Sequence, residues 1–254
     1  FGLWDQKKSS LTLVRDRFGE KPLYYGWQGE GGNKVFLFGS ELKALKVHPV
    51  FKKEIDRNVI ALQLRHNCIP APYSIYKDIH KLLPGCYLQL KESDLKKCLI
   101  PQSKIYWSLT ESAIYGNNNQ LMLSEIDIQK GLEKHLQSSV KKQMISDVPI
   151  GAFLSGGIDS STVVALMQSQ SNHPIKTFTI GFSEEDYSEA KYAKKIAKHL
   201  GTDHTELYVS SKMAMEIIPK LPSIYDEPFS DSSQIPTYLV SQLAKQYVKV
   251  SLSG

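Results

Sequence analysis

The 254-residue sequence is poor in cysteine and lacks any long apolar run. Its three cysteines, Cys68, Cys86 and Cys98, include no Cys-x-x-Cys pair, which argues against a disulfide framework or a zinc site and favours a reducing compartment. No apolar stretch approaches the roughly 20 residues that a membrane-spanning helix needs. The start at Phe1 shows neither an initiator Met nor a signal-peptide pattern. We therefore expect a cytoplasmic protein without a membrane partner.

The sequence also has no large excess of positive or negative charge. Lys and Arg number 31 and Asp and Glu 26, so the formal net charge is only +5, and the excess is scattered along the chain. Such a weak and scattered charge gives no reason to expect a nucleic-acid partner. The hydrophobic fraction of 41% is typical of a globular protein with a large core. The length favours one large domain or two domains of ordinary size.

The first part of the chain has the pattern of an antiparallel, strand-rich α+β fold. Runs of β-forming residues separated by Gly-rich or Pro-containing turns predict strands, and two short helical stretches lie between them. Polarity rises over residues 91–102, and the tract 115–120 is the most loop-like in the sequence. We place a domain boundary within the region 91–120, between residues 108 and 109. The expected strands are 11–14, 22–25, 35–38 and 86–90, and the expected helices are 41–46 and 58–65.

The second part, residues 109–254, alternates strands and helices. It opens with apolar residues at every fourth position from Ile128 to Met144, which predicts an amphipathic helix. Repeated strand–helix–strand units require right-handed crossovers and a mostly parallel, doubly wound α/β sheet. The expected strands are 149–154, 175–182, 204–209 and 248–252, and the expected helices are 161–168, 189–200, 212–218 and 235–246.

The segment Ser155–Ser161, Ser-Gly-Gly-Ile-Asp-Ser-Ser, joins the first of these strands to its helix. Open parallel sheets bind ligands beyond the carboxyl ends of their strands. Adjacent glycines allow the backbone to approach an anion, and the N–H groups at a helix N-terminus attract negative charge. Together with the serine hydroxyls, these features predict a phosphate-binding loop.

Asp159 is the one acidic residue in this loop. A carboxylate beside phosphate requires a cation between them, and Mg²⁺ is commonly held by one or two carboxylates and phosphate oxygens. The sequence has no G-x-x-x-x-G-K-[ST] motif, so no loop lysine is available for a γ-phosphate. Binding and departure of pyrophosphate, with attack on the α-phosphorus of ATP, fits this set of residues. The alternative is a Gly-rich turn in which Asp159 only caps the helix.

These residues resemble the S-G-G-x-D-S loop of the ATP pyrophosphatases, or PP-loop enzymes. The flanking segments narrow the resemblance to the glutamine-dependent asparagine synthetases, and the matches cover nearly the whole chain in order. The matching segments are 147–154, 177–182, 199–202 and 225–228 in the second part, and 15–25 and 40–45 in the first.

The resemblance implies a remnant of an Ntn-type glutaminase domain of class II over residues 1–108, followed by a PP-loop synthetase domain over 109–254. It also implies the reaction. Glutamine hydrolysis supplies ammonia, ATP and Mg²⁺ activate aspartate as β-aspartyl-AMP with release of pyrophosphate, and ammonia displaces AMP to give asparagine. The implied partners are therefore aspartate, glutamine or ammonia, and ATP, and the resemblance allows a homodimer of the full-length enzyme.

The resemblance also implies an internal fragment of a longer enzyme. The family's glutaminase nucleophile is a cysteine at the mature N-terminus, whereas residue 1 is Phe, and none of the three cysteines suits that role. Likewise, the family's acidic loop is expected after Gly254. We expect the 254-residue fragment itself to have no glutaminase activity and little synthetase activity.

Carried over by resemblance, the loop residues receive specific roles. Asp159 would bind Mg²⁺, Leu154 would border the nucleotide, and Ile180 would contact adenine through its backbone. Ser253 and Gly254 would line the ATP site if the fourth strand lies beside the first, away from the second. The residues expected to hold pyrophosphate are Ser155, Gly156, Gly157, Ser160 and Ser161.

The sequence leaves alternatives for the roles of several charged residues and for the overall function. Asp226, Glu227 and Asp231 either face aspartate or a metal, or belong to a solvated loop with helix-capping acids. Arg15, Asp16 and Lys21 are expected to brace a hairpin. A relative of the family that amidates a sugar or peptide, or closes a β-lactam ring, is the alternative enzyme, and a non-catalytic scaffold is the alternative outside enzymes.

Overall fold

The structure is a computed structural model that describes residues 1–182 and 189–254. Contacts divide the chain into two compact units: unit 1 contains residues 1–121 and 221–231, and unit 2 contains residues 122–220 and 232–254. The chain therefore passes between the units after residues 121, 220 and 231. Within the described ranges, no helix combines the length and the apolar character needed to cross a membrane.

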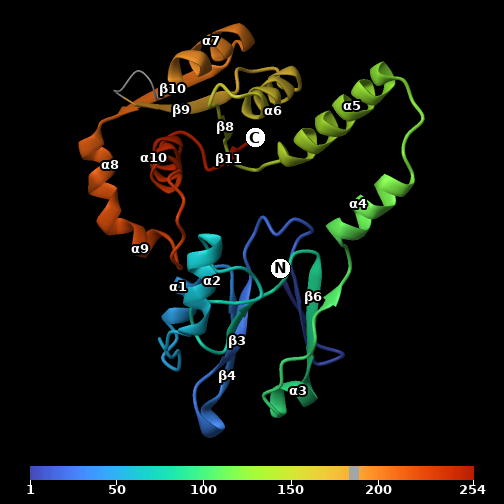
Figure 1. Cartoon of the computed structure of the whole chain (residues 1–254), viewed down its shortest axis with the longest axis vertical. Helices are drawn as coiled ribbons and strands as arrows, with labels where there is room; N and C mark the ends of the chain where they lie inside the picture. Colours follow the sequence, from blue (N-terminus) through green and yellow to red (C-terminus); the bar gives the residue numbers. More distant parts are fainter. Residues whose placement is uncertain (183–188) are drawn as a thin grey trace. The chain divides into compact units, whose positions relative to one another are not determined.

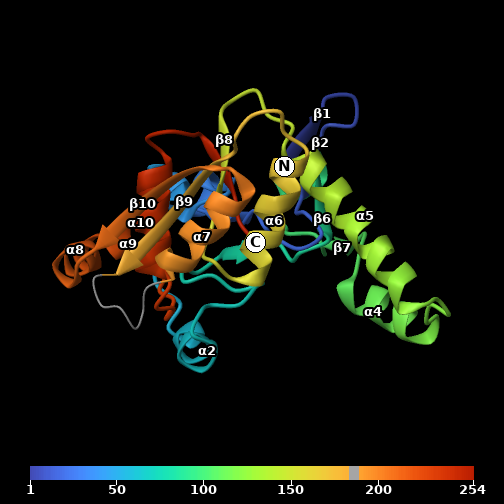
Figure 2. The same ribbon diagram turned by 90° about the horizontal axis from the view of Figure 1, so that it is seen from above.

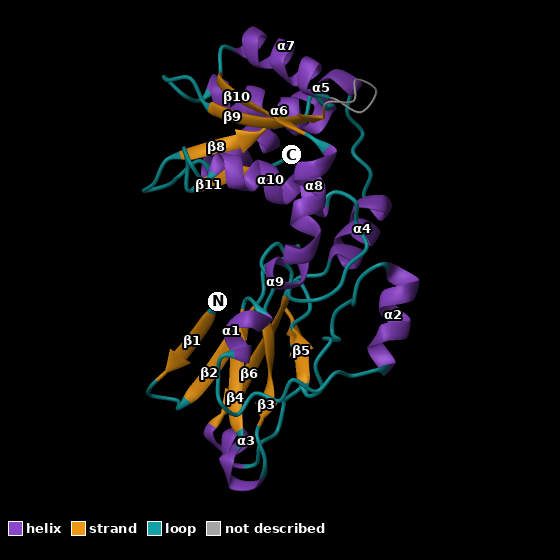
Figure 3. Cartoon of the chain, turned by 90° about the vertical axis from the view of Figure 1, so that its left-hand side faces the viewer, coloured by secondary structure: helices purple, strands orange, loops and turns teal. Residues whose placement is uncertain are grey.

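Unit 1 contains two antiparallel sheets (Figure 3). The first has the order β1-β2-β6-β7 and the second the order β4-β3-β5. The strands are β1 (Gly2–Asp5), β2 (Ser10–Val14), β3 (Tyr24–Gln28), β4 (Val35–Gly39), β5 (Ile79–Lys81), β6 (Cys86–Lys91) and β7 (Lys104–Ile105). The short strands β1, β5 and β7 are additions to the strands expected from the sequence, and the expected strand at 22–25 begins only at Tyr24.

The core of unit 1 follows from side-chain alternation along the strands. Leu13 of β2 and Leu88 of β6 pack in one cluster with Tyr25 of β3, so this cluster joins the two sheets. The neighbouring Tyr24 points to the opposite face of β3, because successive strand residues alternate. There it packs with Leu37 and with residues of the first helix, including Leu42.

The helices of unit 1 are short. They are α1 (Leu42–Lys46), α2 (Asn58–His66), α3 (Glu92–Lys96), α4 (Leu109–Asn118) and α9 (Leu221–Ile224), with a 3₁₀ turn η1 at Gly31–Asn33. Helix α4 corrects the expectation of a loop at 115–120, since it continues through Asn118. Ser108 supplies the reason, because its side chain accepts a hydrogen bond from the Glu111 N–H and starts the helix.

Unit 2 is built on a four-stranded sheet in which every pair is parallel (Figure 1). Its strands are β8 (Ile150–Phe153), β9 (Lys176–Phe182), β10 (Asp203–Val209) and β11 (Val250–Leu252), in the order β10-β9-β8-β11. Strand β11 pairs with β8 on the side opposite β9, which is the arrangement expected to bring Ser253 and Gly254 to the loop after β8.

Helices cover both faces of this sheet. The helices are α5 (Glu125–Gln143), α6 (Ile158–Ser169), α7 (Ala190–Leu200), α8 (Ser211–Ile217) and α10 (Gln234–Ala244), with a 3₁₀ turn η3 at Ile218–Lys220. On one face, Ala152 and Leu154 pack with Val164 of α6 and Ala193 of α7, two helices that lie side by side (Figure 2). On the other face, α10 contributes Val240, Leu243 and Ala244 to a second cluster around Phe178.

Candidate functional site

The loop after β8 leads directly into α6. Helix α6 begins at Ile158, three residues before the start expected at Ser161, so Asp159 and Ser160 lie in its first turn. Gly157 is the N-cap, and no side chain caps this helix end. The first N–H groups of a helix have no partner within the helix. The N-terminus of α6 therefore offers unpaired donors and the positive end of the helix dipole to an anion.

The fold requires glycine at only one of the two glycine positions of the loop. Gly156 has a φ of +89°, and a Cβ there would lie 2.9 Å from Cβ of Tyr192 and 3.0 Å from the Ala193 nitrogen. Both the backbone conformation and the contact with α7 therefore require glycine at this position. Gly157 has an ordinary φ of −73°. A Cβ on Gly157 would meet only the Ser155 hydroxyl, at 3.3 Å, so the fold itself leaves room for a side chain there.

The serine hydroxyls hold the loop in shape. The Oγ atoms of Ser155 and Ser160 are 2.9 Å apart, and the N–H groups of Ser155 and Gly157 donate to Ser160 Oγ and Ser155 Oγ, each at 3.2 Å. Ser161 Oγ donates to the Gly157 carbonyl at 2.6 Å. Ser160 is buried, whereas Ser155 and Asp159 are exposed. The loop is thus organised by its own side chains, which limits the reorganisation needed to bind a ligand.

Asp159 is the second residue of α6 and does not cap the helix, because the N-cap is Gly157. Its side chain is exposed and makes no hydrogen bond or ion pair with the other residues that the structure describes. An acid in the first turn is stabilised by the helix dipole. The carboxylate is therefore accessible and available to a cation.

A cavity of about 430 Å³ lies beside the loop in unit 2, and we call it the Ser155 cavity. Leu154, Ser155 and Ile180, three of the residues expected at the nucleotide, line it together. It lies at the carboxyl ends of β8 and β9, where open α/β sheets bind ligands. The other lining residues are Phe153, Phe178, Thr179, Phe182, Glu189, Ser233, Pro236, Thr237 and Val240, so the wall is mainly apolar with a few polar groups.

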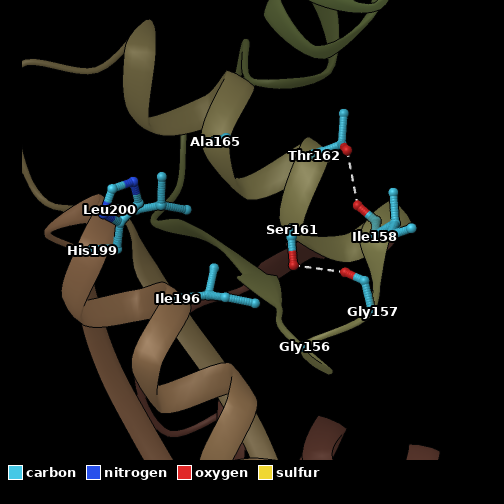
Figure 4. Close-up of a pocket in the computed structure, with 9 residues that line it drawn as sticks. All are labelled: Gly156, Gly157, Ile158, Ser161, Thr162, Ala165, Ile196, His199 and Leu200. Carbon is cyan, nitrogen blue, oxygen red and sulfur yellow. Dashed lines mark hydrogen bonds between the residues drawn. The ribbon is translucent and has the colours of Figure 1, made fainter.

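A second cavity, of about 440 Å³, lies on the other side of the loop between α6 and α7, and we call it the α6–α7 cavity. Figure 4 shows Gly156 and Gly157 at its edge, with Ser161 donating to the Gly157 carbonyl. Ile196, His199 and Leu200 of α7 form its opposite wall (Figure 4). Asp159 lines neither cavity and lies at the exposed helix end between the loop and the end of β11.

Gly254 lies against the first turn of α6. A Cβ on Gly254 would be 2.6 Å from the Asp159 carbonyl carbon and 2.6 Å from the Ser160 nitrogen. The backbone after β11 thus approaches the loop more closely than any side chain would allow. The expected meeting of Gly254 with the Ser155–Ser161 segment at the edge of the sheet is present in unit 2.

Two of the three acids in the segment 225–231 are buried and paired, which excludes the solvated-loop alternative for them. Asp226 and Glu227 belong to unit 1, where their side chains are only 10% and 9% exposed and are bound by Lys43 and Lys81. They therefore do not belong to a solvated loop. Both also line a cavity of about 190 Å³ in unit 1, and a role of these acids toward aspartate or a metal stays a prediction. Asp231 is exposed.

Arg15 and Asp16 brace the turn after β2, as expected. The Arg15 guanidinium donates to the carbonyl oxygens of Lys21, Leu82 and Gly19, at 3.1, 2.7 and 2.9 Å. Burial lowers the pKa of Arg15. For Asp16, burial opposes ionisation, but N–H donors from Glu20, Lys21 and Gly19 hold its pKa below the usual value. Lys21 takes part through its backbone.

Several residues of the Ser155 cavity were missed from the sequence. Phe153 and Phe182 end their strands, so the rule that ligands bind at carboxyl ends was a usable signal for them. Ser233 and Thr237 at the start of α10 carried no such signal, because their place in the cavity depends on how α10 packs on β9. Among the described residues, no group of three or more His, Cys, Asp and Glu side chains is arranged to hold a metal.

Comparisons with known proteins agree with this arrangement. The sequence model for asparagine synthase matches residues 131–254, and the model for a glutamine amidotransferase domain matches residues 1–107. A putative glutamine-hydrolysing asparagine synthetase 2 of Methanocaldococcus jannaschii is 40% identical over 259 residues, covering 100% of this chain and 47% of that protein.

Two further relatives are more distant. Asparagine synthetase 1 of Bacillus subtilis is 32% identical over 255 residues, and a putative asparagine synthetase of Mycobacterium tuberculosis is 33% identical over 261 residues. Both matches cover 100% of this chain and 37% of the relative, so the chain spans less than half the length of these relatives. With matches in both units and along its whole length, the chain belongs to the family of glutamine-hydrolysing asparagine synthetases.

Proposed function

We propose that the protein makes asparagine from aspartate, with residues 109–254 forming part of a PP-loop synthetase domain and residues 1–108 part of an Ntn-type glutaminase domain. One side-chain oxygen of aspartate attacks the α-phosphorus of ATP, the bond to the β-phosphate breaks, and pyrophosphate leaves. Ammonia from glutamine then attacks the acyl carbon of β-aspartyl-AMP, loses a proton and displaces AMP. The single observation that carries the proposal is the uncapped N-terminus of α6 beside the Ser155 cavity.

In this proposal the loop binds the phosphates and the cavity binds the rest of the nucleotide. Unpaired N–H groups at the start of α6 and the backbone of Gly156 and Gly157 receive pyrophosphate. Ser155, Ser160 and Ser161 fix the loop, and Ser155 and Ser161 also add hydroxyl groups at its surface. Leu154 and Ile180 supply an apolar wall for adenine in a cavity whose volume, about 430 Å³, is in the usual range for small-molecule sites.

Asp159 fits a magnesium site that is completed by the nucleotide. It is a single exposed carboxylate without a partner among the described residues, and Mg²⁺ often binds one protein carboxylate while phosphate and water oxygens fill its remaining positions. When bound, Mg²⁺ would neutralise charge on the departing pyrophosphate. Ser253 and Gly254 would form the neighbouring wall, since Gly254 already touches the first turn of α6.

The glutaminase nucleophile is not assigned to any cysteine of this chain. Cys86 is buried, and burial raises the pKa of its thiol, which opposes formation of a nucleophilic thiolate. Cys68 is exposed, and Cys98 is partly buried at a backbone φ of +51°. Neither cysteine has the free amine that would serve as its own base in a terminal-cysteine mechanism.

The proposal is tested with the full-length protein. With Mg-ATP, aspartate and ammonium, we expect pyrophosphate, AMP and asparagine in equal amounts, and no pyrophosphate when aspartate is omitted. Aspartate carrying a heavy oxygen isotope in its side chain should transfer one labelled oxygen to AMP. Formation of ADP and phosphate, or pyrophosphate release that another carboxylate supports better than aspartate, would contradict the proposal.

A further inference from the structure

Thr177 and Thr179 both belong to β9, the strand between β8 and β10 in the parallel sheet of unit 2. Successive side chains of a strand point to opposite faces, so the two threonines share one face of the sheet. Phe178 lies between them and points to the other face, where it packs with residues of α10. Both threonines are buried, with 0% and 4% of their surface exposed. Two buried hydroxyl groups on one face of one strand can therefore be compared.

The Thr177 hydroxyl is bound within the fold. Its Oγ1 atom lies 2.9 Å from Thr202 Oγ1 and 2.9 Å from His204 Nδ1. Both partners follow α7 in the chain, Thr202 just before β10 and His204 within it. A threonine hydroxyl has one hydrogen to donate and two lone pairs that accept, and these contacts use it. The Thr177 hydroxyl therefore has a structural role.

The Thr179 hydroxyl makes no hydrogen bond to any part of the chain that the structure describes. Glu206 is opposite Thr179 on β10, but its carboxylate has other partners. The Lys194 ammonium lies 3.1 Å from this carboxylate, and the Tyr208 hydroxyl donates to it at 2.9 Å. Because a buried hydroxyl without a partner lowers the stability of a fold, the position of this one calls for an explanation.

The wall of the Ser155 cavity gives that explanation. Thr179 lines this cavity, and the other polar side chains among its described lining residues are all exposed. Phe153 pairs with Phe178 on the neighbouring strand, so Leu154 comes next to Thr179 in the sheet. Leu154 and Ile180 line the same cavity. Thr179 is thus a buried hydroxyl between two apolar residues of the cavity wall.

The surroundings of Thr179 indicate which part of a nucleotide would meet it. The phosphates belong at the N-terminus of α6, where unpaired N–H groups attract negative charge. The apolar wall formed by Leu154 and Ile180 suits a flat aromatic base. The edge of adenine carries ring nitrogens that accept hydrogen bonds and an amino group that donates them, and a hydroxyl can serve either kind. A single hydrogen bond in an apolar wall would also fix the orientation of the base.

We propose that Thr179 is a specificity-determining residue of the Ser155 cavity, and that its hydroxyl forms a hydrogen bond with the edge of the adenine ring. Thr177, on the same face of the same strand, has no part in binding. The inference rests on the proposed function for the identity of the nucleotide, ATP.

The test uses three variants of the full-length protein. Thr179→Val replaces the hydroxyl by a methyl group of similar size and keeps the β-branched shape, and Thr179→Ser keeps the hydroxyl. Thr177→Val is the matched control, because it makes the same change at the hydroxyl that is bound within the fold. Calorimetry measures the Kd for ATP, for 2′,3′-dideoxy-ATP and for tripolyphosphate, each with Mg²⁺, and the melting temperature is measured in parallel.

We expect Thr179→Val to raise the Kd for ATP and for 2′,3′-dideoxy-ATP about fivefold, because each loses one hydrogen bond to its base. The Kd for tripolyphosphate, which has no base, should stay at the wild-type value. The melting temperature of this variant should be equal to or above that of the wild type, since an unpartnered hydroxyl is removed from a buried position. Thr179→Ser should keep the wild-type affinity for ATP within about twofold.

The control should show the reverse pattern. Thr177→Val should lower the melting temperature, because it removes the partner of Thr202 and His204, and should leave all three Kd values unchanged. A Thr179→Val variant with the wild-type Kd for ATP would overturn the proposal. An equal rise for tripolyphosphate would place the contact at the phosphates, and a rise for ATP alone would place it at the ribose. A Thr179→Val variant that melts well below the wild type, or does not fold, would show that the fold itself uses the hydroxyl.

These outcomes can be separated from a failure of the proposed function. If the wild type binds Mg-ATP but releases no pyrophosphate with aspartate, the proposed reaction is wrong, and the comparison of Kd values remains valid. If the wild type makes asparagine and Thr179→Val binds Mg-ATP normally, only the role of Thr179 is wrong. A wild type that binds tripolyphosphate and ATP equally well would show that the cavity does not recognise adenine, and would overturn the inference about Thr179.

Discussion

Two acidic loops of this chain show opposite arrangements of their carboxylates. In the Ser155–Ser161 loop, Asp159 is exposed and has no partner among the described residues. In the segment Leu221–Asp231 of unit 1, Asp226 and Glu227 are about nine-tenths buried and each is bound by a lysine and by a backbone N–H group. Both segments contain several turn-forming residues, namely Gly and Ser in the first and Pro, Ser and Asp in the second. Whether an acid is already paired therefore separates a candidate ligand-binding residue from a structural one.

Among the substitutions that test this comparison, Asp159→Asn is expected to have the largest effect. We expect Asp159→Asn to lower pyrophosphate release by the full-length protein ~1,000-fold, or about 4 kcal/mol, because the charge that would hold the metal is lost. Stability should change by less than about 0.5 kcal/mol, since the side chain is exposed. Asp203→Asn, at an exposed acid paired with Lys176, is the control and should retain the wild-type rate. Near-normal turnover of Asp159→Asn would remove the metal-binding role.

For Glu227 we expect the opposite result, namely that its substitution mainly lowers the free energy of unfolding. We expect Glu227→Gln to lower the free energy of unfolding of unit 1 by about 3 kcal/mol, because it leaves the buried Lys81 ammonium without its counter-ion. Denaturant titrations followed by tryptophan fluorescence would measure this loss. Glu54→Gln, which breaks the exposed pair of Glu54 with Lys77, is the control and should lose much less. Equal losses in the two variants would show that burial of the Glu227 pair has no special effect.

The two loop glycines provide a finer test within the Ser155–Ser161 segment. We expect Gly156→Ala to cost about 2 kcal/mol, because its φ is +89° and the new Cβ would press on α7. Gly157→Ala meets only the Ser155 hydroxyl, so its stability should stay near that of the wild type while its Kd for Mg-ATP rises. Thermal unfolding and calorimetry of both variants would measure the two effects. A Gly157→Ala variant with unchanged affinity would mean that phosphate does not approach this backbone.

Asp226 is expected to give the smallest effect. Its hydrogen bond to the Lys43 N–H resembles a helix cap for α1, so Asp226→Asn, which keeps an accepting oxygen, should cost about 1 kcal/mol or less. Asp226→Ala should cost more than Asp226→Asn, and the difference reports the hydrogen bond itself. Denaturation midpoints of the two variants would check this. Identical midpoints would show that the capping bond adds no stability.

Much of unit 2 could be predicted from the sequence because its signals are local. Apolar runs followed by helical periodicity gave the four strands of the parallel sheet, and the Gly201 C-cap of α7 has the expected left-handed conformation. The start of α6 was placed three residues too late. The reason is that Gly157 caps the helix without a side chain, so the usual Ser, Thr, Asp or Asn signal is missing at that position.

The features that could not be predicted depend on contacts between distant parts of the chain. Strand β5 has only three residues, and it is a strand because Ile79 and His80 pair with Gly26 and Tyr25 of β3. The partners of Asp226 and Glu227 lie 183 and 152 positions earlier in the chain, at Lys43 and Ile75. Neither hydrophobic periodicity nor turn composition carries information about such pairings. Resemblance to a family supplied the candidate nucleotide residues but not these attachments.

The discontinuous make-up of unit 1 has a practical consequence for dissecting the gene. Truncation after codon 121 would encode both antiparallel sheets but omit the segment Leu221–Asp231, which also belongs to unit 1. The Lys81 ammonium would then lose its carboxylate, and the Lys43 amide its acceptor. We expect such a truncation product to be less stable than the same unit carrying the eleven-residue peptide Leu221–Asp231, added in trans or fused through a flexible linker. Recombinant work on unit 1 should therefore include that peptide from the outset.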